Sequence, residues 1–297
     1  MSDFFHSCTP SALIRVQGED TFDYLQSQLT IDMSKLDAGR FCFGLRLDKK
    51  GKVMAGIYVI PLDSETVLLL SRGSPPPQLI TLFEENLVAD DVELFDESSR
   101  FRLITIQGNS AEKIFKQLNI EPPSKDKVSQ SGGILSFLDS RLPDTTYSIL
   151  ASENETINSL KEFNSMDWNW LDEKRIHLGL ANIPQEIGPE ELPQEAQLQK
   201  DCVDFEKGCY LGQEVMARIQ AMGKVRRKLI PVKIFASNCH SIPSPLLKDG
   251  KKVGMLKSCV GHSNNFIGLA ILHENTISAL ENNQIEVQGF DARISPI

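Results

Sequence analysis

Apolar and polar residues alternate in the same way along two stretches of the chain that lie ninety residues apart. Residues 13–18 read Leu-Ile-Arg-Val-Gln-Gly, and residues 103–108 read Leu-Ile-Thr-Ile-Gln-Gly. Each stretch is followed by a polar cap and an amphipathic run, over 19–29 and over 109–118. The pattern predicts a strand, a glycine turn and a helix in both places. We interpret the likeness as an internal duplication, although chance also explains it because such units are common.

The same alternation predicts further strands and helices. The predicted strands lie at 41–47, 53–60, 66–70, 92–95, 134–138 and 147–150, and the predicted helices at 78–88, 154–163 and 168–180. Residues 181–206 form an acidic connector in which Pro184, Pro189 and Pro193 exclude a long helix. From residue 228 onward, short alternating segments predict a small β-barrel, with strands at 229–235, 252–259, 267–272 and 284–287.

These elements predict an α+β fold. We expect a first α+β subdomain over 1–100, a second over 101–180, a connector over 181–223 and a C-terminal β-barrel over 224–297.

Composition narrows the function classes. The 297 residues carry 31 basic and 40 acidic side chains, a formal charge of −9, which argues against a general nucleic-acid binder. The N-terminus lacks the features of a secretory signal or transit peptide, and apolar runs such as 67–70 are too short to cross a bilayer, so we expect a cytoplasmic protein without a membrane partner. The six cysteines are scattered without a CxxC pair, which predicts that most of them are free thiols and that they form no metal site.

One short loop stands out chemically. Gly208 and Gly212 bracket Cys209-Tyr210-Leu211, and glycines at both ends permit a sharp turn and a close backbone approach to a ligand. A helix is predicted to start at Gly212, with Gln213 and Glu214 in its first turn. Cys209 would then lie just ahead of a helix N-terminus and beside Lys207, and both features favour a thiolate. From the residues alone, a buried structural thiol is the better interpretation.

The string Lys207-Gly208-Cys209-Tyr210-Leu211-Gly212-Gln213-Glu214 resembles the signature of the YgfZ family, which is related to the T-protein (aminomethyltransferase) of glycine cleavage. Other segments resemble the family in the same order: residues 18–32 its first helix, 48–52 its D-x-K-G-K/R turn, 175–179 the helix before the signature, 193–198 the segment between, and 217–218 the Ala-Arg that follows. The resemblance runs from about residue 11 into the C-terminal barrel and is thin across 100–165.

The resemblance implies a ring of two ferredoxin-like βα subdomains and a small barrel, with tetrahydrofolate or a derivative bound near the central opening and the first subdomain contributing to folate binding. It also implies support for making or repairing iron–sulfur enzymes, including enzymes that modify tRNA. The partners would be folate, iron–sulfur client proteins and, indirectly, tRNA. Cys209 is the position that matches the family's functional cysteine.

The resemblance also suggests which side chains meet the folate: Trp170, Arg175, His177, Tyr210 and Arg218. An indole stacks well on a flat pterin, although Trp170 fits a core anchor equally well, and Tyr210 fits packing under the loop. His177 falls where T-proteins place a pterin-binding glutamate, and Ser27 replaces a usual glycine. A further basic cluster, Lys224, Arg226, Arg227 and Lys228, fits a solvated strand edge better than a site for a folate tail or RNA.

One departure bears on catalysis. The carboxylate that assists aminomethyl transfer in the T-protein lies where this chain has Met54 and Ala55, and neither side chain can act as an acid or base. We therefore expect a folate-binding helper that acts through Cys209, with a folate-dependent aminomethyl or methyl transferase of the T-protein type as the alternative.

Overall fold

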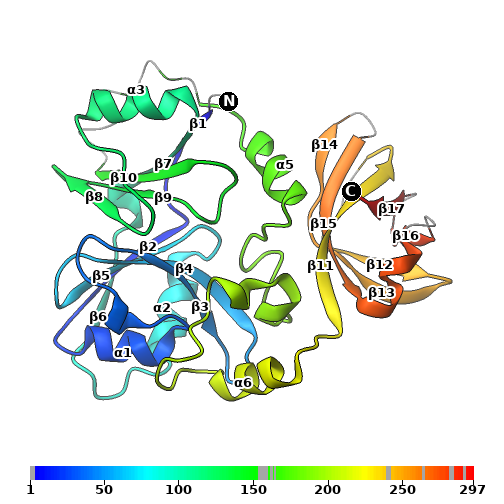
Figure 1. Cartoon of the computed structure of the whole chain (residues 1–297), viewed down its shortest axis with the longest axis horizontal. Helices are drawn as coiled ribbons and strands as arrows, with labels where there is room; N and C mark the ends of the chain where they lie inside the picture. The colour runs from blue at the N-terminus through cyan, green and yellow to red at the C-terminus, as the bar shows by residue number, and fades with distance from the viewer. Residues whose placement is uncertain are drawn as a thin grey trace.

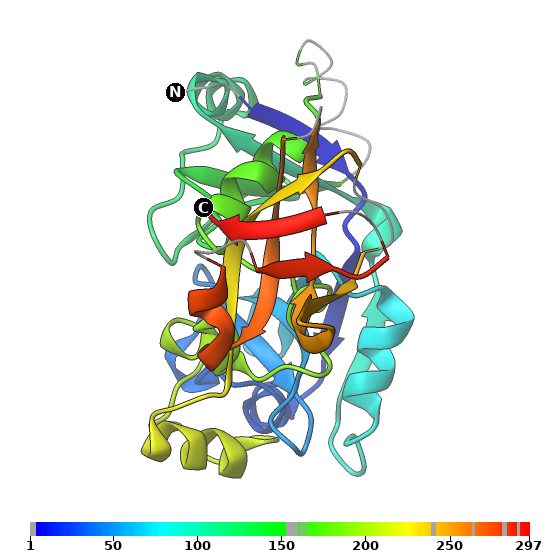
Figure 2. The same cartoon turned by 90° about the vertical axis from the view of Figure 1, so that its right-hand side faces the viewer.

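The computed structural model describes residues 4–152, 160, 163, 165–238, 242–262, 265–280, 284–289 and 292–297. Two antiparallel sheets lie on one side of the molecule and a β-barrel on the other, with the connector between them (Figure 1). Figure 2 views the molecule from the barrel side. The predicted α+β class, with two sheet-and-helix units and a barrel, is confirmed.

The first sheet has the strand order β3-β4-β5-β2-β6. Its strands are β2 (Ala12–Gln17), β3 (Cys42–Leu47), β4 (Val53–Pro61), β5 (Thr66–Ser71) and β6 (Glu93–Asp96). Helices α1 (Thr21–Gln28) and α2 (Pro76–Glu84) pack on one face, with Ile14 turned toward them, whereas Leu13 faces the second sheet. Because both faces are covered, the central strands are apolar along most of their length.

The second sheet has the order β1-β7-β10-β9-β8. Its strands are β1 (Phe4–Cys8), β7 (Phe101–Gln107), β8 (Val128–Ser131), β9 (Ile134–Leu138) and β10 (Thr146–Ser152), and α3 (Asn109–Leu118) covers its outer face. The edge strand β1 pairs antiparallel with β7, Phe4 opposite Gln107 and Cys8 opposite Leu103. The chain therefore forms an edge strand of the second sheet before it crosses to the first. The expected boundary at residue 100 does not account for this crossing.

The connector contains α5 (Asn169–His177), the 3-10 turns η3 (Pro193–Ala196) and η4 (Leu198–Lys200), and α6 (Gln213–Met222). Short 3-10 turns η1 (Met33–Lys35) and η2 (Ser98–Arg100) lie earlier in the chain, and η5 (Glu274–Ala279) lies in the barrel. No helix in the described ranges is long and apolar enough to cross a membrane.

The barrel closes through six strands, because β11 pairs with both β17 and β15, and β14 extends it at β15. Its strands are β11 (Arg227–Ala236), β12 (Ser244–Lys248), β13 (Lys251–Leu256), β14 (Val260–His262), β15 (Asn265–His273), β16 (Ile285–Val287) and β17 (Ala292–Pro296). Strands β1, β8, β12, β14 and β17 were not predicted from the pattern. The predicted helix at 154–163 falls largely outside the described residues.

Candidate functional site

The loop of residues 207–214, called the signature loop below, runs along the C-terminal end of α1. The Leu211 N–H donates to the carbonyl of Ser27 at 3.1 Å. Just upstream, the Asp204 N–H donates to the carbonyl of Thr30 at 2.8 Å. The path of the loop is therefore set by backbone hydrogen bonds to residues that end the first helix.

Lys207 anchors this loop from inside the molecule. Its side chain is buried, and Nζ donates to the carbonyls of Gln26, Leu29 and Ile31 at 2.5, 2.7 and 2.7 Å. Carbonyls at a helix C-terminus lack partners within the helix and carry its negative pole, so a cation suits them. Burial lowers the pKa of Lys207 to about 8, against the opposing charges of Asp32 and Asp204. The Lys207 ammonium is thus hydrogen-bonded to carbonyl groups at and just after the C-terminal end of α1.

Gly212 fixes the other end of the loop. Its φ is +84°, and a Cβ there would lie 2.6 Å from the carbonyl oxygen of Asp48. Asp48 opens the turn of residues 48–52, where its carboxylate accepts the N–H groups of Lys50 and Lys52 at 2.8 and 2.7 Å. The D-x-K-G-K turn and the signature loop, distant in sequence, therefore meet, and the position tolerates no side chain without displacing backbone.

Cys209 lies between these two anchors with its side chain exposed. Helix α6 begins at Gln213, as the sequence predicted, with Glu214 exposed in its first turn. Cys8 and Cys42 are half-buried and Cys202 is buried, and burial raises the pKa of both Cys42 and Cys202 to about 11. Cys209 is therefore the free thiol in the described part of the chain that a second molecule can reach directly.

Tyr210 turns inward next to this thiol. Its ring is buried with the Lys207 ammonium 5.2 Å from its centroid, and burial raises its pKa to about 12. The hydroxyl has no hydrogen-bond partner among the described residues. The ring packs under the loop, while Gly208 and Cys209 remain exposed.

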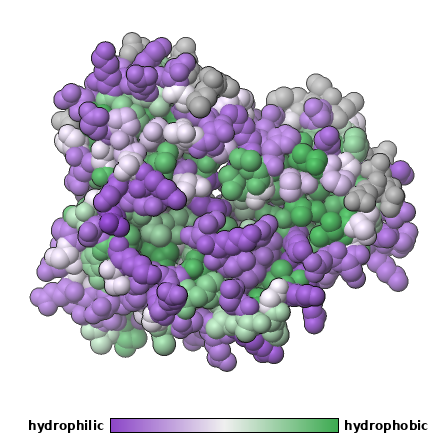
Figure 3. Space-filling view, in the orientation of Figure 1, coloured by the Kyte–Doolittle hydropathy of each residue, from purple (hydrophilic) through white to green (hydrophobic). Residues whose placement is uncertain are grey.

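A separate cavity of about 220 Å³, called the central cavity below, opens where the sheets meet the connector. It is lined by residues that include His6, Cys8, Arg72, Trp168, Asn182 and Gln185. Arg72 and Asn182 also line an adjoining pocket of about 30 Å³, together with Phe43 and Arg141. The space-filling view shows the surface hollowed where the parts of the molecule meet (Figure 3).

Arg72 carries the charge of the central cavity. Its Nη2 donates to Asp139 Oδ2 at 2.8 Å and to Ser148 Oγ at 2.6 Å, and the Tyr58 hydroxyl donates to Asp139 Oδ1 at 2.5 Å. Nε of Arg72 and Nη2 of Arg141 are buried without a partner in the described part of the chain. Unpaired buried donors beside a cavity suit a ligand that presents carbonyl or carboxylate oxygens. The Trp168 ring lies 5.7 Å from the Arg72 guanidinium and offers a flat apolar surface.

None of the five residues expected to meet folate lines the central cavity. Trp170 stacks on Phe4 at 5.2 Å, with the Lys174 ammonium 4.0 Å from its ring. His177 and Arg218 are exposed on α5 and α6.

Arg175 is 3% exposed and fully engaged within the connector. Its Nη1 and Nη2 donate to the Glu186 carboxylate at 2.7 and 3.0 Å, and its Nε donates to Asp172 at 2.6 Å. Its guanidinium therefore ties α5 to the loop that follows, which carries Asn182 and Gln185 into the central cavity.

Met54 and Ala55 lie in β4, with Ala55 fully buried and Met54 packed against the core of the first sheet. The position thus holds apolar side chains and no carboxylate. The carboxylate of the Arg72 network, Asp139, has no exposed side-chain surface. Sequence reasoning did not identify Arg72, Asp139 or Trp168, because no spacing relates Arg72 to a partner 67 residues away.

The chain is similar to several known proteins. Residues 8–131 match the family model described as the GCVT N-terminal domain. An uncharacterized protein of Haemophilus influenzae is 28% identical over 285 residues, which cover 94% of this chain and 91% of that protein. A "tRNA-modifying protein YgfZ" of Sodalis glossinidius is 29% identical over 226 residues, which cover 73% of this chain and 67% of that protein.

Among solved structures, the glycine cleavage system aminomethyltransferase T of Bartonella henselae has a TM-score of 0.80 and 13% identity, covering 99% of this chain and 85% of that chain. At that identity the likeness concerns the fold. A group of three or more His, Cys, Asp or Glu side chains placed to hold a metal does not occur among the described residues.

Proposed function

We propose that this chain, which is similar to YgfZ proteins, matches the GCVT N-terminal domain over residues 8–131 and has the fold of the glycine cleavage aminomethyltransferase, is a folate-binding accessory protein that supports the assembly or repair of iron–sulfur enzymes. The clients include enzymes that modify tRNA, in keeping with the similarity to a tRNA-modifying protein, YgfZ. The iron–sulfur cluster belongs to the client, and Cys209 is the group that serves it.

The observation that carries this proposal is the exposure of Cys209 on a loop held at both ends. Lys207 secures one side through three carbonyls, and Gly212 secures the other against the turn at Asp48. A thiol that was only a packing group would be buried, as Cys202 is. An exposed thiol on a fixed loop can instead meet a group on a second protein with little loss of conformational freedom.

Folate binding rests on the central cavity. Tetrahydrofolate and its derivatives combine a flat pterin with ring carbonyl and carboxylate oxygens. The unpaired nitrogens of Arg72 and Arg141 would hydrogen-bond such oxygens, and the Trp168 indole would contact an apolar ring face. The folate-contact roles of Trp170, Arg175, His177, Tyr210 and Arg218 stay proposals. Arg175 is bound to Glu186 in the loop that carries Asn182 and Gln185 to the central cavity.

The alternative is a folate-dependent aminomethyl or methyl transferase. The fold favours it, since the aminomethyltransferase matches the chain along 99% of its length. The apolar side chains at Met54 and Ala55 and the enclosed carboxylate of Asp139 count against it, because proton transfer needs an acid or base within reach of the substrate.

Rescue of iron–sulfur enzyme activity tests the role of the thiol. In a strain that lacks its own YgfZ-type protein, we expect the native chain and Cys42→Ala to restore activity of a client enzyme, and Cys209→Ala to fail while still accumulating as folded protein. Full rescue by Cys209→Ala would remove the cysteine from the function.

Tryptophan fluorescence tests folate binding, because the chain has two tryptophans and one of them lines the cavity. We expect tetrahydrofolate to quench emission in Trp170→Phe and much less in Trp168→Phe. Ligand at about 100 times its Kd should stabilise the protein by about 2.7 kcal/mol. Absence of both quenching and a thermal shift would exclude folate. Folate-dependent glycine cleavage by the purified chain with its partner proteins would favour the alternative.

A further inference from the structure

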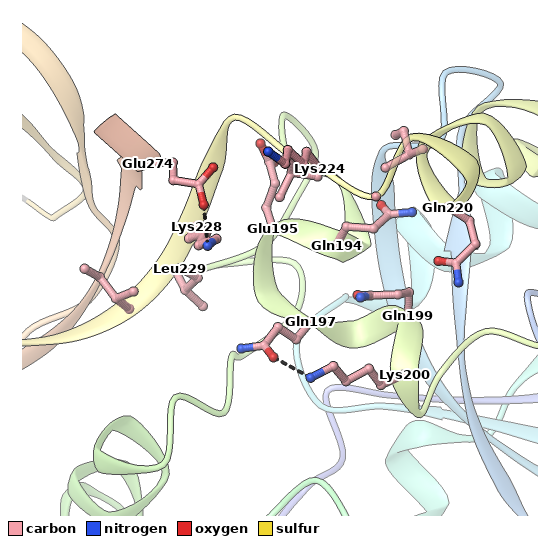
Figure 4. A pocket seen from close by; sticks show the side chains of 14 residues that line it. Gln194, Glu195, Gln197, Gln199, Lys200, Gln220, Lys224, Lys228, Leu229 and Glu274 are labelled. Atoms are coloured by element: carbon pink, nitrogen blue, oxygen red, sulfur yellow. Dashed lines mark hydrogen bonds and ion pairs between the residues drawn. The ribbon is translucent and has the colours of Figure 1, made fainter. Parts of the chain in front are cut away.

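A second cavity, of about 340 Å³, lies where the connector, α6 and the barrel meet, and it is called the junction pocket below (Figure 4). Turns η3 and η4 form one wall, the C-terminal end of α6 another, and β11 with η5 the third. The residues lining it are distinct from those of the central cavity. Its volume is in the range of small-molecule sites.

Two glutamine amides at this pocket have unmet hydrogen-bonding capacity. Gln194 is 8% exposed; its Nε2 lies 3.4 Å from the sulfur of Met216, and its Oε1 has no partner among the described residues. Gln199 Oε1 is likewise buried and unpartnered in that part of the chain. Figure 4 shows both amides at the pocket. A buried acceptor without a donor is costly, so the site calls for a ligand that brings N–H or O–H groups.

The rim of the junction pocket is cationic in a chain of net charge −9. Of its charged side chains, Glu274 is paired with Lys228 at 2.6 Å and Glu195 with Arg227 at 2.8 Å. Lys200 and Lys224 remain on exposed positions of the rim. Lys200 Nζ donates to Gln197 Oε1 at 2.7 Å, which uses one of the three donors of an ammonium. A local surplus of positive charge suits an anionic group.

The apolar part of the pocket is aliphatic: Ile219, Val225, Leu229 and Ile230. The lining contains no aromatic side chain, so a flat base or pterin would find no ring to stack on. We propose that the junction pocket binds an amino-acid-like ligand, a carboxylate with a neighbouring N–H donor and a short stem, as a free amino acid or as the C-terminal residue of a peptide. The N–H groups meet Gln194 and Gln199, and the carboxylate meets Lys200 and Lys224.

Such a ligand would act at a distance from the thiol. The junction pocket lies at the C-terminal end of α6, whereas Cys209 precedes its N-terminus. A helix of ten residues is about 15 Å long, so the ligand and the thiol do not compete for space. Bound between α6 and β11, the ligand would bridge the segment where the chain enters the barrel and would stabilise that junction.

Calorimetric titration of the full chain tests this proposal. The probes are L-glutamate, L-glutamine and glycine, then the tripeptide Gly-Gly-Gln with a free and with an amidated C-terminus, and inorganic phosphate and AMP as other anions, each up to about 10 mM. We expect binding of at least one free carboxylate probe and none of the amidated peptide. Lys224→Ala and Gln199→Leu should each weaken binding about tenfold. The exposed controls Lys233→Ala and Gln78→Ala should bind as the native chain does.

Binding of amino acids alone identifies a metabolite as the ligand, and binding of the free-ended peptide alone identifies a chain end. Three results would overturn the proposal: no heat with any probe, tighter binding of phosphate or AMP than of every carboxylate, or unchanged affinity in both variants. Lys224 is exposed, so its substitution leaves the fold intact, and a thermal melt of each variant verifies this. The test is independent of folate, because Trp168→Phe should leave the titration unaffected.

Discussion

Replacing Lys207 with methionine isolates the anchor that holds the signature loop to α1. Methionine keeps the length and apolar stem of the side chain but removes the ammonium that serves Gln26, Leu29 and Ile31. The bonds to Leu29 and Ile31 are fully buried, and a buried acceptor left unpaired costs about 1–3 kcal/mol. Loss of the burial cost of the ammonium offsets part of this. We expect Lys207→Met to lower the free energy of unfolding by roughly 2–3 kcal/mol.

Urea unfolding followed by circular dichroism measures this loss, with the exposed Lys200→Met as the matched control. Hydrogen exchange at the Leu211 amide, which donates to Ser27, reports whether the loop itself loosens. A destabilisation below about 0.5 kcal/mol would refute the argument, since ordinary surface substitutions remain within that range. So would unchanged protection of the Leu211 amide.

The pH dependence of the same difference has a definite sign. Burial lowers the pKa of Lys207 to about 8 in the folded chain from an ordinary 10.5. Between these values the unfolded chain binds more protons than the folded one, so the contribution of Lys207 to stability rises with pH across that window. Below about pH 8 both states are charged and the contribution is constant. A native-minus-variant difference that falls from pH 8 to 10 would show that the three carbonyls favour the charge more than burial penalises it.

Two further predictions concern the same loop. Gly212→Ala should lower the free energy of unfolding by about 2–4 kcal/mol, because the alanine would have a strained φ and its Cβ would be forced against the Asp48 carbonyl oxygen. The control Gly208→Ala, whose Cβ would meet nothing within 4 Å, should be nearly neutral. Equal losses of stability for the two variants in urea titrations would contradict the predicted contact. Iodoacetamide at pH 8 should label Cys209 well before Cys42, because a pKa of about 11 leaves about one Cys42 side chain in a thousand as thiolate. Mass spectrometry should show the rate of Cys42 labelling rising about tenfold for each pH unit. Early labelling of Cys42 would refute its burial.

The sequence predicted strands best where apolar residues alternate without interruption. Strands β2, β4, β5 and β7 lie where they were expected because their side chains reach cores on both faces. Strands β8 and β14 were missed because their sequences, Val-Ser-Gln-Ser and Val-Gly-His, carry little apolar signal. Their position depends on pairing with β9 and β15, which a local pattern does not contain.

The signature string located the loop and its cysteine but not the directions of its side chains. Lys207 was expected beside the thiol as a charge that favours thiolate, whereas its ammonium turns inward to α1. Arg72 directly follows β5 of the first sheet and Asp139 directly follows β9 of the second, so their ion pair arises only when those sheets pack. A single sequence holds no signal for such a pair, because neither residue differs in type from many solvated charges.

Strand β1 lies in the second sheet although the chain that follows it forms the first, so the molecule does not divide into two independent units near residue 100. A cut near residue 100 would leave β7 with an unpaired edge, since its neighbour lies at residues 4–8. The same cut would remove Phe4, and with it the surface on which Trp170 stacks. Strand β1 thus links the two sheet units. We expect them to fold and unfold as one cooperative body, because closure of this long loop has to precede completion of the second core.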